Sequence, residues 1–114
     1  MTNIIYGNRE GQYFTEWRFD ELRYLLNILT GQTPLGQLQI PEAKIYYDSQ
    51  QDFHHLEFSC NGHNVNVRLY KVFSANIDGT DAWVGCPRRA VHDFAISIRR
   101  KLDPKVDEFH RQHQ

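Results

Sequence analysis

Residues 53–70 read FHHLEFSCNGHNVNVRLY, and this stretch decides the fold of the chain. Two runs of alternating apolar and polar residues flank Asn61-Gly62, a dipeptide typical of the type I′ turn of a β-hairpin. If Asn61-Gly62 is the turn, counting outward from it sets the pairing of the two strands. One face then carries the pairs Cys60 with His63, Phe58 with Val65, Leu56 with Val67, and His54 with Leu69.

The other face of this hairpin is polar. It carries the pairs Ser59 with Asn64, Glu57 with Asn66, and His55 with Arg68. One apolar and one polar face are typical of an antiparallel sheet that packs on a core with one side and meets water with the other.

Composition predicts one folded domain over residues 1–114. Hydrophobic residues make up 40% of the chain and aromatic residues 13%, which is too many for a disordered segment and enough for one core. The net charge of −1 argues against the strongly basic domain typical of nucleic-acid-binding proteins.

Two cysteines far apart in sequence, Cys60 and Cys86, do not form the pattern of a secreted disulfide framework. The N-terminus lacks the features of a signal peptide, and no apolar run has the length of a membrane span. We therefore expect a cytoplasmic protein that makes no contact with a membrane.

The N-terminal third allows two interpretations. Asn3–Tyr6 is a short apolar run, and residues 12–18 alternate, so together they predict a first hairpin. The alternative is a helix that starts at Thr15. A helix is clearer from Asp20, a good N-cap, up to Gly31, with the apolar stripe Leu22, Leu25, Leu26 and Leu29.

More strands follow the loop 31–41, which contains two prolines. Residues 43–47 form one strand, and the phase slips near Lys71, which indicates a bulge or a strand that leaves the core. Asp78-Gly79 is a second hairpin turn. A regular register about it pairs Ile77 with Thr80, Ala75 with Ala82, and Phe73 with Val84.

The last large element is an amphipathic helix that starts at Pro87, and Asp103-Pro104 separates it from a short helix over residues 105–110. Its apolar stripe is Val91, Phe94, Ala95, Ile98 and Leu102. Strands in one run with helices on one side of them predict an α+β fold. We expect an antiparallel meander of four to six strands, packed on one face by two amphipathic helices.

The cluster His54, His55, Cys60 and His63 resembles a set of metal ligands only in the linear sequence. His54 and His55 point to opposite faces of the hairpin, and His54 lies about 20 Å along the strand from Cys60. Only Cys60 and His63 converge, and two ligands do not make a zinc site. We expect no metal, and a buried cysteine beside a hydrogen-bonded histidine.

Cys86, Arg88 and Arg89 open the last helix and predict an alternative function. A cysteine at a helix start beside arginines can be a reactive thiolate, and the same amides can bind an anion. Asp78 and Asp81 are the nearest acidic residues in sequence that could offset the two arginines. His63 or His92 could act as the base if the fold brings one of them close.

The basic residues of the last helix give a second alternative, a nucleic-acid-binding module. Acidic residues interrupt the basic ones, however, and most charged helix faces are simply the side in water. The basic set is Arg88, Arg89, Arg99, Arg100, Lys101 and Arg111.

The chain contains none of the phosphate-binding, dinucleotide-binding or catalytic motifs that define common enzyme classes. We therefore expect no cofactor and a non-enzymatic binding protein that neutralises a protein partner. An immunity or inhibitor protein against a bacterial toxin or similar effector fits best, because tyrosine, tryptophan and arginine dominate binding hot spots. The expected partner-binding residues are Tyr46, His55, Glu57, Asn64, Asn66, Arg68, Tyr70 and Trp83.

Overall fold

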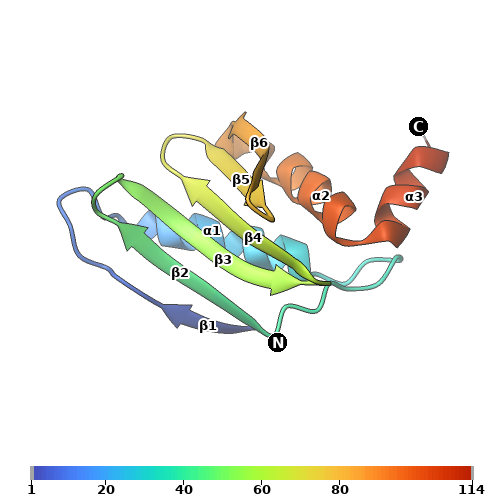
Figure 1. Ribbon diagram of the computed structural model, residues 1–114, viewed down its shortest axis with the longest axis horizontal. Coiled ribbons are helices and arrows are strands. Elements are labelled where there is room, and N and C mark those ends of the chain that lie inside the picture. Colours follow the sequence, from blue (N-terminus) through green and yellow to red (C-terminus); the bar gives the residue numbers. More distant parts are fainter. Residues whose placement is uncertain (1, 114) are drawn as a thin grey trace.

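The computed structural model describes residues 2–113 as an α+β fold built on one six-stranded sheet (Figure 1). The strands lie side by side in chain order, and every neighbouring pair is antiparallel except β1 with β2. The predicted fold class is confirmed, with three α-helices in place of two. The strands are β1 (Asn3–Tyr6), β2 (Glu42–Asp48), β3 (Phe53–Cys60), β4 (His63–Leu69), β5 (Phe73–Ile77) and β6 (Thr80–Cys86). The helices are α1 (Glu16–Thr30), the 3₁₀ turn η1 (Arg88–Ala90), α2 (Val91–Leu102) and α3 (Pro104–Gln112).

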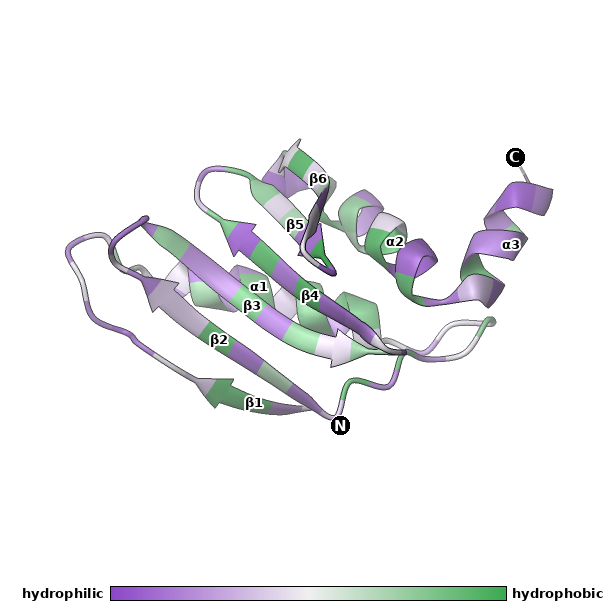
Figure 2. Cartoon of the chain, in the orientation of Figure 1, coloured by the Kyte–Doolittle hydropathy of each residue, from purple (hydrophilic) through white to green (hydrophobic). Residues whose placement is uncertain are grey.

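The central hairpin has the predicted register. Every predicted pair between β3 and β4 is present, from His54 with Leu69 to Cys60 with His63. Asn61 and Gly62 have φ angles of 52° and 81°, and a type I′ turn requires positive φ at both central positions. Apolar and polar residues alternate along the two strands (Figure 2).

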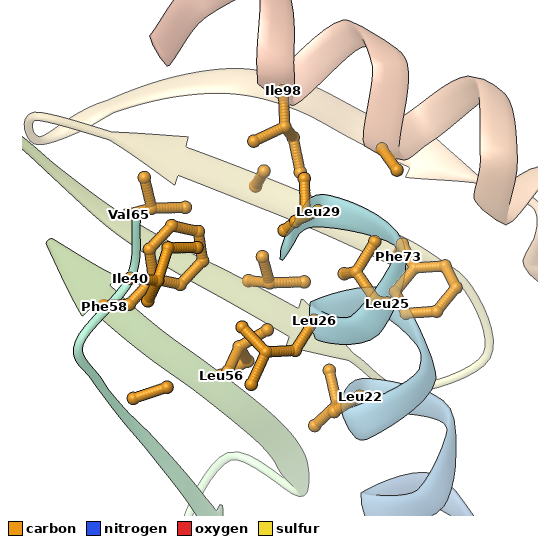
Figure 3. Close-up of a cluster of buried hydrophobic side chains, with 14 of the residues drawn as sticks. Leu22, Leu25, Leu26, Leu29, Ile40, Leu56, Phe58, Val65, Phe73 and Ile98 are labelled. Carbon is orange, nitrogen blue, oxygen red and sulfur yellow. The ribbon is translucent and has the colours of Figure 1, made fainter. Parts of the chain in front are cut away.

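Helices α1 and α2 cover the same face of the sheet and enclose one core (Figure 3). The predicted stripe of α1 is wholly inside this core, from Leu22 to Leu29. Phe73 of β5 stacks on Phe94 of α2 with ring centroids 5.2 Å apart. Each such side chain contributes about 1.5–3 kcal/mol through burial. Helix α3 packs against α2 rather than on the sheet, and it lies at one end of the molecule (Figure 1).

The predicted N-terminal hairpin is wrong, and the alternative of a helix starting at Thr15 is correct. Thr15 is the N-cap of α1, five residues before the predicted cap at Asp20. Phe14 and Phe19 pack edge to face at 5.0 Å. The alternating residues that suggested a strand therefore form the segment that leads into α1 and its first turn. Strand β1 instead pairs in parallel with β2, and α1 lies within the crossover that such a pairing needs.

The second hairpin departs from the predicted register. Ile77 pairs with Thr80 as expected, but two irregularities shift the rest of β6. Ala75 therefore pairs with Trp83 instead of Ala82, and Phe73 pairs with Cys86 instead of Val84. Bulges insert extra residues into one strand, and here they bring Trp83 and Cys86 to the core side along with Ala82 and leave Val84 exposed.

The C-terminal helices follow the prediction with two differences. Pro87 precedes the 3₁₀ turn η1, and α2 itself starts at Val91. Arg99 does not belong to a basic surface, because it is buried and donates to the carbonyl oxygens of Gly31 and Gly36 at 3.4 and 2.7 Å. No helix within residues 2–113 combines the length and apolar content that a membrane span requires.

Candidate functional site: the outer face of the sheet

The face of the sheet opposite α1 and α2, called here the outer face, carries most of the predicted binding residues. Side chains alternate along a strand and cross-strand partners point to the same side. Tyr46 of β2, His55 of β3 and Arg68 of β4 therefore form one row. Glu57 and Asn66 form the next row, and Asn64 lies in the row beyond it. No helix among residues 2–113 packs on this face.

Glu57 is the centre of a hydrogen-bond network on the outer face. Its Oε1 accepts from the Tyr46 hydroxyl at 2.9 Å and from Asn66 Nδ2 at 2.6 Å. The Oδ1 of Asn66 in turn accepts from His55 Nδ1 at 2.9 Å. Four side chains from three strands thus fix one another in the free protein.

Tyr46 and His55 stack within this network, with ring centroids 4.8 Å apart. Burial and the hydrogen bond to Glu57 raise the pKa of Tyr46 to about 12, so its hydroxyl stays protonated and remains a donor. His55 is only 6% exposed although it lies on the outer face, because its neighbours cover it. These contacts restrict the side chains of Tyr46 and His55, while Tyr46, Glu57 and Arg68 remain partly exposed on the outer face.

The outer face ends on one side at the two hairpin turns, which a single aspartate joins. Asp78 Oδ1 accepts the backbone N–H of Asn64 at 2.8 Å, and its Oδ2 accepts from His63 Nδ1 at 2.6 Å. Both bonds hold the pKa of Asp78 below its usual range. Beside these turns is a shallow hollow of about 620 Å³, whose lining mixes apolar residues such as Pro41 with the polar side chains of Lys44, Glu57 and Asn66.

The opposite side of the outer face is aromatic. Phe53 lies in phase with His55 on β3, and the guanidinium of Arg68 lies 5.6 Å from its ring centroid. Tyr70 follows the end of β4, is 40% exposed, and packs edge to face on Phe53 at 6.2 Å. Tyr70 thus joins the face as predicted. Phe53 was missed, although its two-residue spacing from His55 placed it there.

Trp83 is not on the outer face, and its predicted place there is wrong. Through the bulged pairing it shares the side of Ala75, which is fully buried. Its ring is partly buried against the core and borders a hollow beside Arg100 and Pro104, where α2 meets α3. Val84, expected in the core, is instead 74% exposed.

The geometry around Cys86 differs from that of an activated thiol. Cys86 ends β6, and partial burial followed by the charge of Asp93 raises the pKa of its thiol. Within residues 2–113, no hydrogen bond joins Cys86 to a histidine; its closest polar contacts are the carbonyl oxygens of Pro87 and Ala90, at 3.7 and 3.9 Å. The features that predicted a reactive thiolate are therefore not assembled.

The positive charge of Arg88 is compensated by a different acidic residue from those predicted. Arg88 Nε donates to Glu21 Oε1 of α1 at 2.9 Å. The predicted acidic partners lie elsewhere, because Asp78 binds His63 and Asp81 lies 3.4 Å from Arg68. Arg89 is exposed on the three-residue turn η1.

The three histidines and the single cysteine of the central hairpin are arranged as its geometry predicted. His54 is buried in the core, and His55 lies on the outer face. Cys60 is a buried free thiol opposite His63, whose ring is bonded to Asp78. Residues 2–113 contain no group of three or more histidine, cysteine or acidic side chains that could hold a metal ion.

Comparison of the chain with known protein families, with curated proteins and with solved structures finds no significant match in any of the three. The function is therefore inferred from the geometry of the outer face.

Proposed function

We propose that this chain is a non-enzymatic binding protein that covers a surface of a protein partner with the outer face of its sheet. The kind of protein that fits best is an immunity or inhibitor protein, which neutralises a toxin or a similar effector in the cytoplasm of a bacterium. The observation that carries the proposal is a sheet face that no helix of residues 2–113 covers. The polar and aromatic side chains of this face already bond to one another in a network.

Two properties of the outer face support binding rather than simple solvation. Tyr46, Tyr70 and Arg68 are of the residue types that dominate binding energy in protein interfaces. The hydrogen bonds to Glu57 and the stack of Tyr46 on His55 also restrict side-chain rotation in the free protein. A face that is ordered before binding loses less conformational entropy when the partner arrives.

Capture of a partner from a lysate of the native host tests this proposal. The bait is the tagged protein, and the variants are Arg68→Ala and Tyr70→Ala on the outer face. Arg111→Ala is the matched control, because Arg111 is exposed on α3 at the far end of the molecule. We expect one stoichiometric protein that the control retains and both face variants lose, and whose activity falls when the purified wild-type chain is added.

Two results would contradict the proposal. One is equal capture by the wild type and both face variants, which would place the interface elsewhere. The other is capture of nucleic acid alone that elutes with moderate salt, the behaviour of a nucleic-acid-binding module.

A further inference from the structure

Six residues from four segments that are far apart in sequence form a continuous strip of guanidinium groups and aromatic rings at one end of the molecule. We call this the arginine–aromatic strip. It starts on the outer face, where Arg68 lies 5.6 Å from the centroid of Phe53, and passes to Tyr70 at 6.2 Å from Phe53. In order, its members are Arg68, Phe53, Tyr70, Arg18, Trp17 and Arg88.

The second half of the strip lies on the start of α1 and on η1. Arg18 is 5.7 Å from the ring centroid of Tyr70 and 4.7 Å from that of Trp17. Arg88 reaches the same Trp17 ring at 4.5 Å. Arg18 Nε also donates to the carbonyl oxygen of Tyr70 at 3.0 Å, which ties α1 to the turn between β4 and β5. The strip therefore extends the outer face around the edge of the sheet.

The strip is accessible and carries more positive than negative charge. Trp17 is 42% exposed and Tyr70 40% exposed. Lys71 adds another cation 5.7 Å from the Tyr70 ring. Two carboxylates lie against the strip, those of Glu21 and Asp81, and each faces an arginine. The nearby acids Glu16 and Asp20 pair outside the strip, with Arg9 and Arg23.

The guanidinium groups keep unused donors. Arg18 bonds through Nε to Tyr70 and through Nη1 to Thr15, and it makes no ion pair within residues 2–113. Arg88 bonds through Nε to Glu21, and no hydrogen bond within residues 2–113 uses its two terminal nitrogens. A planar guanidinium with free N–H groups binds carboxylates in a forked geometry.

We infer that the arginine–aromatic strip binds carboxylate side chains on an acidic patch of the protein partner. This inference rests on the proposed function and adds the chemistry of the surface that the partner presents. Single-stranded nucleic acid fits less well, because its bases stack on free aromatic faces. Here guanidinium and ammonium groups already lie against the rings of Trp17 and Tyr70.

Defined anionic probes test the inference without the natural partner. The probes are a fluorescent polyglutamate peptide, an uncharged glycine–serine peptide of equal length, and a single-stranded oligothymidine, each followed by fluorescence anisotropy. We expect the polyglutamate peptide to bind and the glycine–serine peptide not to bind. The double variant Arg18→Gln with Arg88→Gln should weaken polyglutamate binding at least about tenfold, since each arginine–carboxylate bond is a charge-assisted one.

Two further variants distinguish binding by the arginine–aromatic strip from a general effect of positive charge. Lys101→Gln with Arg111→Gln removes the same charge from the end of α2 and from α3, and should leave the affinity within about twofold of wild type. Arg18→Lys with Arg88→Lys keeps the charge but loses the planar fork, and should lie between wild type and the glutamine double variant. Unchanged thermal melts confirm that each variant is folded.

Several results would overturn the inference: no binding of polyglutamate, equal losses in the strip and control variants, or tighter binding of oligothymidine that Trp17→Ala abolishes. These results can be distinguished from results that contradict the proposed function. If Arg68→Ala loses a captured protein partner while polyglutamate does not bind, the outer face is still the interface and only the acidic chemistry of the partner is wrong.

Discussion

The Nε2 atom of His54 accepts the backbone N–H of Thr15 at 3.1 Å, across 39 positions of the chain. His54 is fully buried on β3, with the rings of Phe14, Phe19 and Tyr47 around it. Thr15 is the N-cap of α1, and its own side chain makes no capping hydrogen bond to the helix. A neutral imidazole in the core therefore holds the start of the helix in place.

Protonation of His54 should destabilise the fold. Burial, followed by the charge of Arg18, lowers the pKa of His54 from 6.5 to about 4. Between these two values the unfolded chain binds a proton that the folded chain does not, so stability is full above pH 6.5 and falls as the pH decreases toward 4. The slope contributed by this residue is at most about 1.4 kcal/mol per pH unit. Urea unfolding at a series of pH values measures it.

The variant His54→Gln isolates this effect from that of other titrating groups. Glutamine can accept the Thr15 N–H through its side-chain oxygen but does not titrate. The difference in unfolding free energy between wild type and variant should therefore change with pH between 6.5 and 4 and be constant above 7. A difference that is independent of pH would show that His54 is not the titrating group.

Substitutions at two adjacent residues of β6 test the bulged register. Trp83→Ala should lower the unfolding free energy by about 1–3 kcal/mol, because the ring packs against the core side of the sheet. Val84→Ala should change it by less than about 0.5 kcal/mol, because Val84 is 74% exposed. A regular register predicts the reverse order of the two losses. Denaturant titration of both variants decides between the registers.

Substitutions at Arg99 and Arg100 compare the contribution of a buried arginine to stability with that of its neighbour on the surface. Arg99→Met removes the donors to the carbonyl oxygens of Gly31 and Gly36 and should cost about 1–3 kcal/mol, since the Gly31 oxygen loses its side-chain donor and the Gly36 oxygen keeps only its bonds from Thr33. Arg100→Met breaks the bridge to Asp107, which is one-third exposed, and should cost less than about 1 kcal/mol. The variants are compared by thermal and urea unfolding. Similar costs would mean that the contact of Arg99 with the loop does not stabilise the fold.

Cys86 should react slowly with an alkylating reagent. Partial burial and the charge of Asp93 raise the pKa of its thiol, so the thiolate fraction at neutral pH is smaller than for an ordinary cysteine. Iodoacetamide labelling followed by mass spectrometry should be slower than for a free thiol peptide at pH 7 and accelerate above pH 9. Cys60→Ser leaves Cys86 as the one thiol of the chain and keeps the readout specific. Faster labelling of Cys86 than of the peptide would instead support the alternative of a reactive thiolate at Cys86.

Much of the fold follows from local sequence patterns. The Asn61-Gly62 turn and the strict alternation on both sides of it set the register of β3 and β4. A shift by one residue would move the apolar side chains from the core face of the sheet to the face exposed to water. Counting outward from this turn is also enough to place His55, Glu57, Asn66 and Arg68 on one face of the hairpin. The apolar stripes of α1 and α2 likewise predict both helices.

Tertiary packing decided the remaining features, because each depends on groups that are distant in sequence. The first turn of α1 depends on His54, the burial of Arg99 on carbonyl oxygens more than 60 positions away, and the side taken by Trp83 on bulges in β6. The arginine–aromatic strip joins residues 17 to 88 and has no local signature. Periodicity reports the face of an element on which a residue lies, whereas contacts between elements depend on their packing, which no short stretch of sequence encodes.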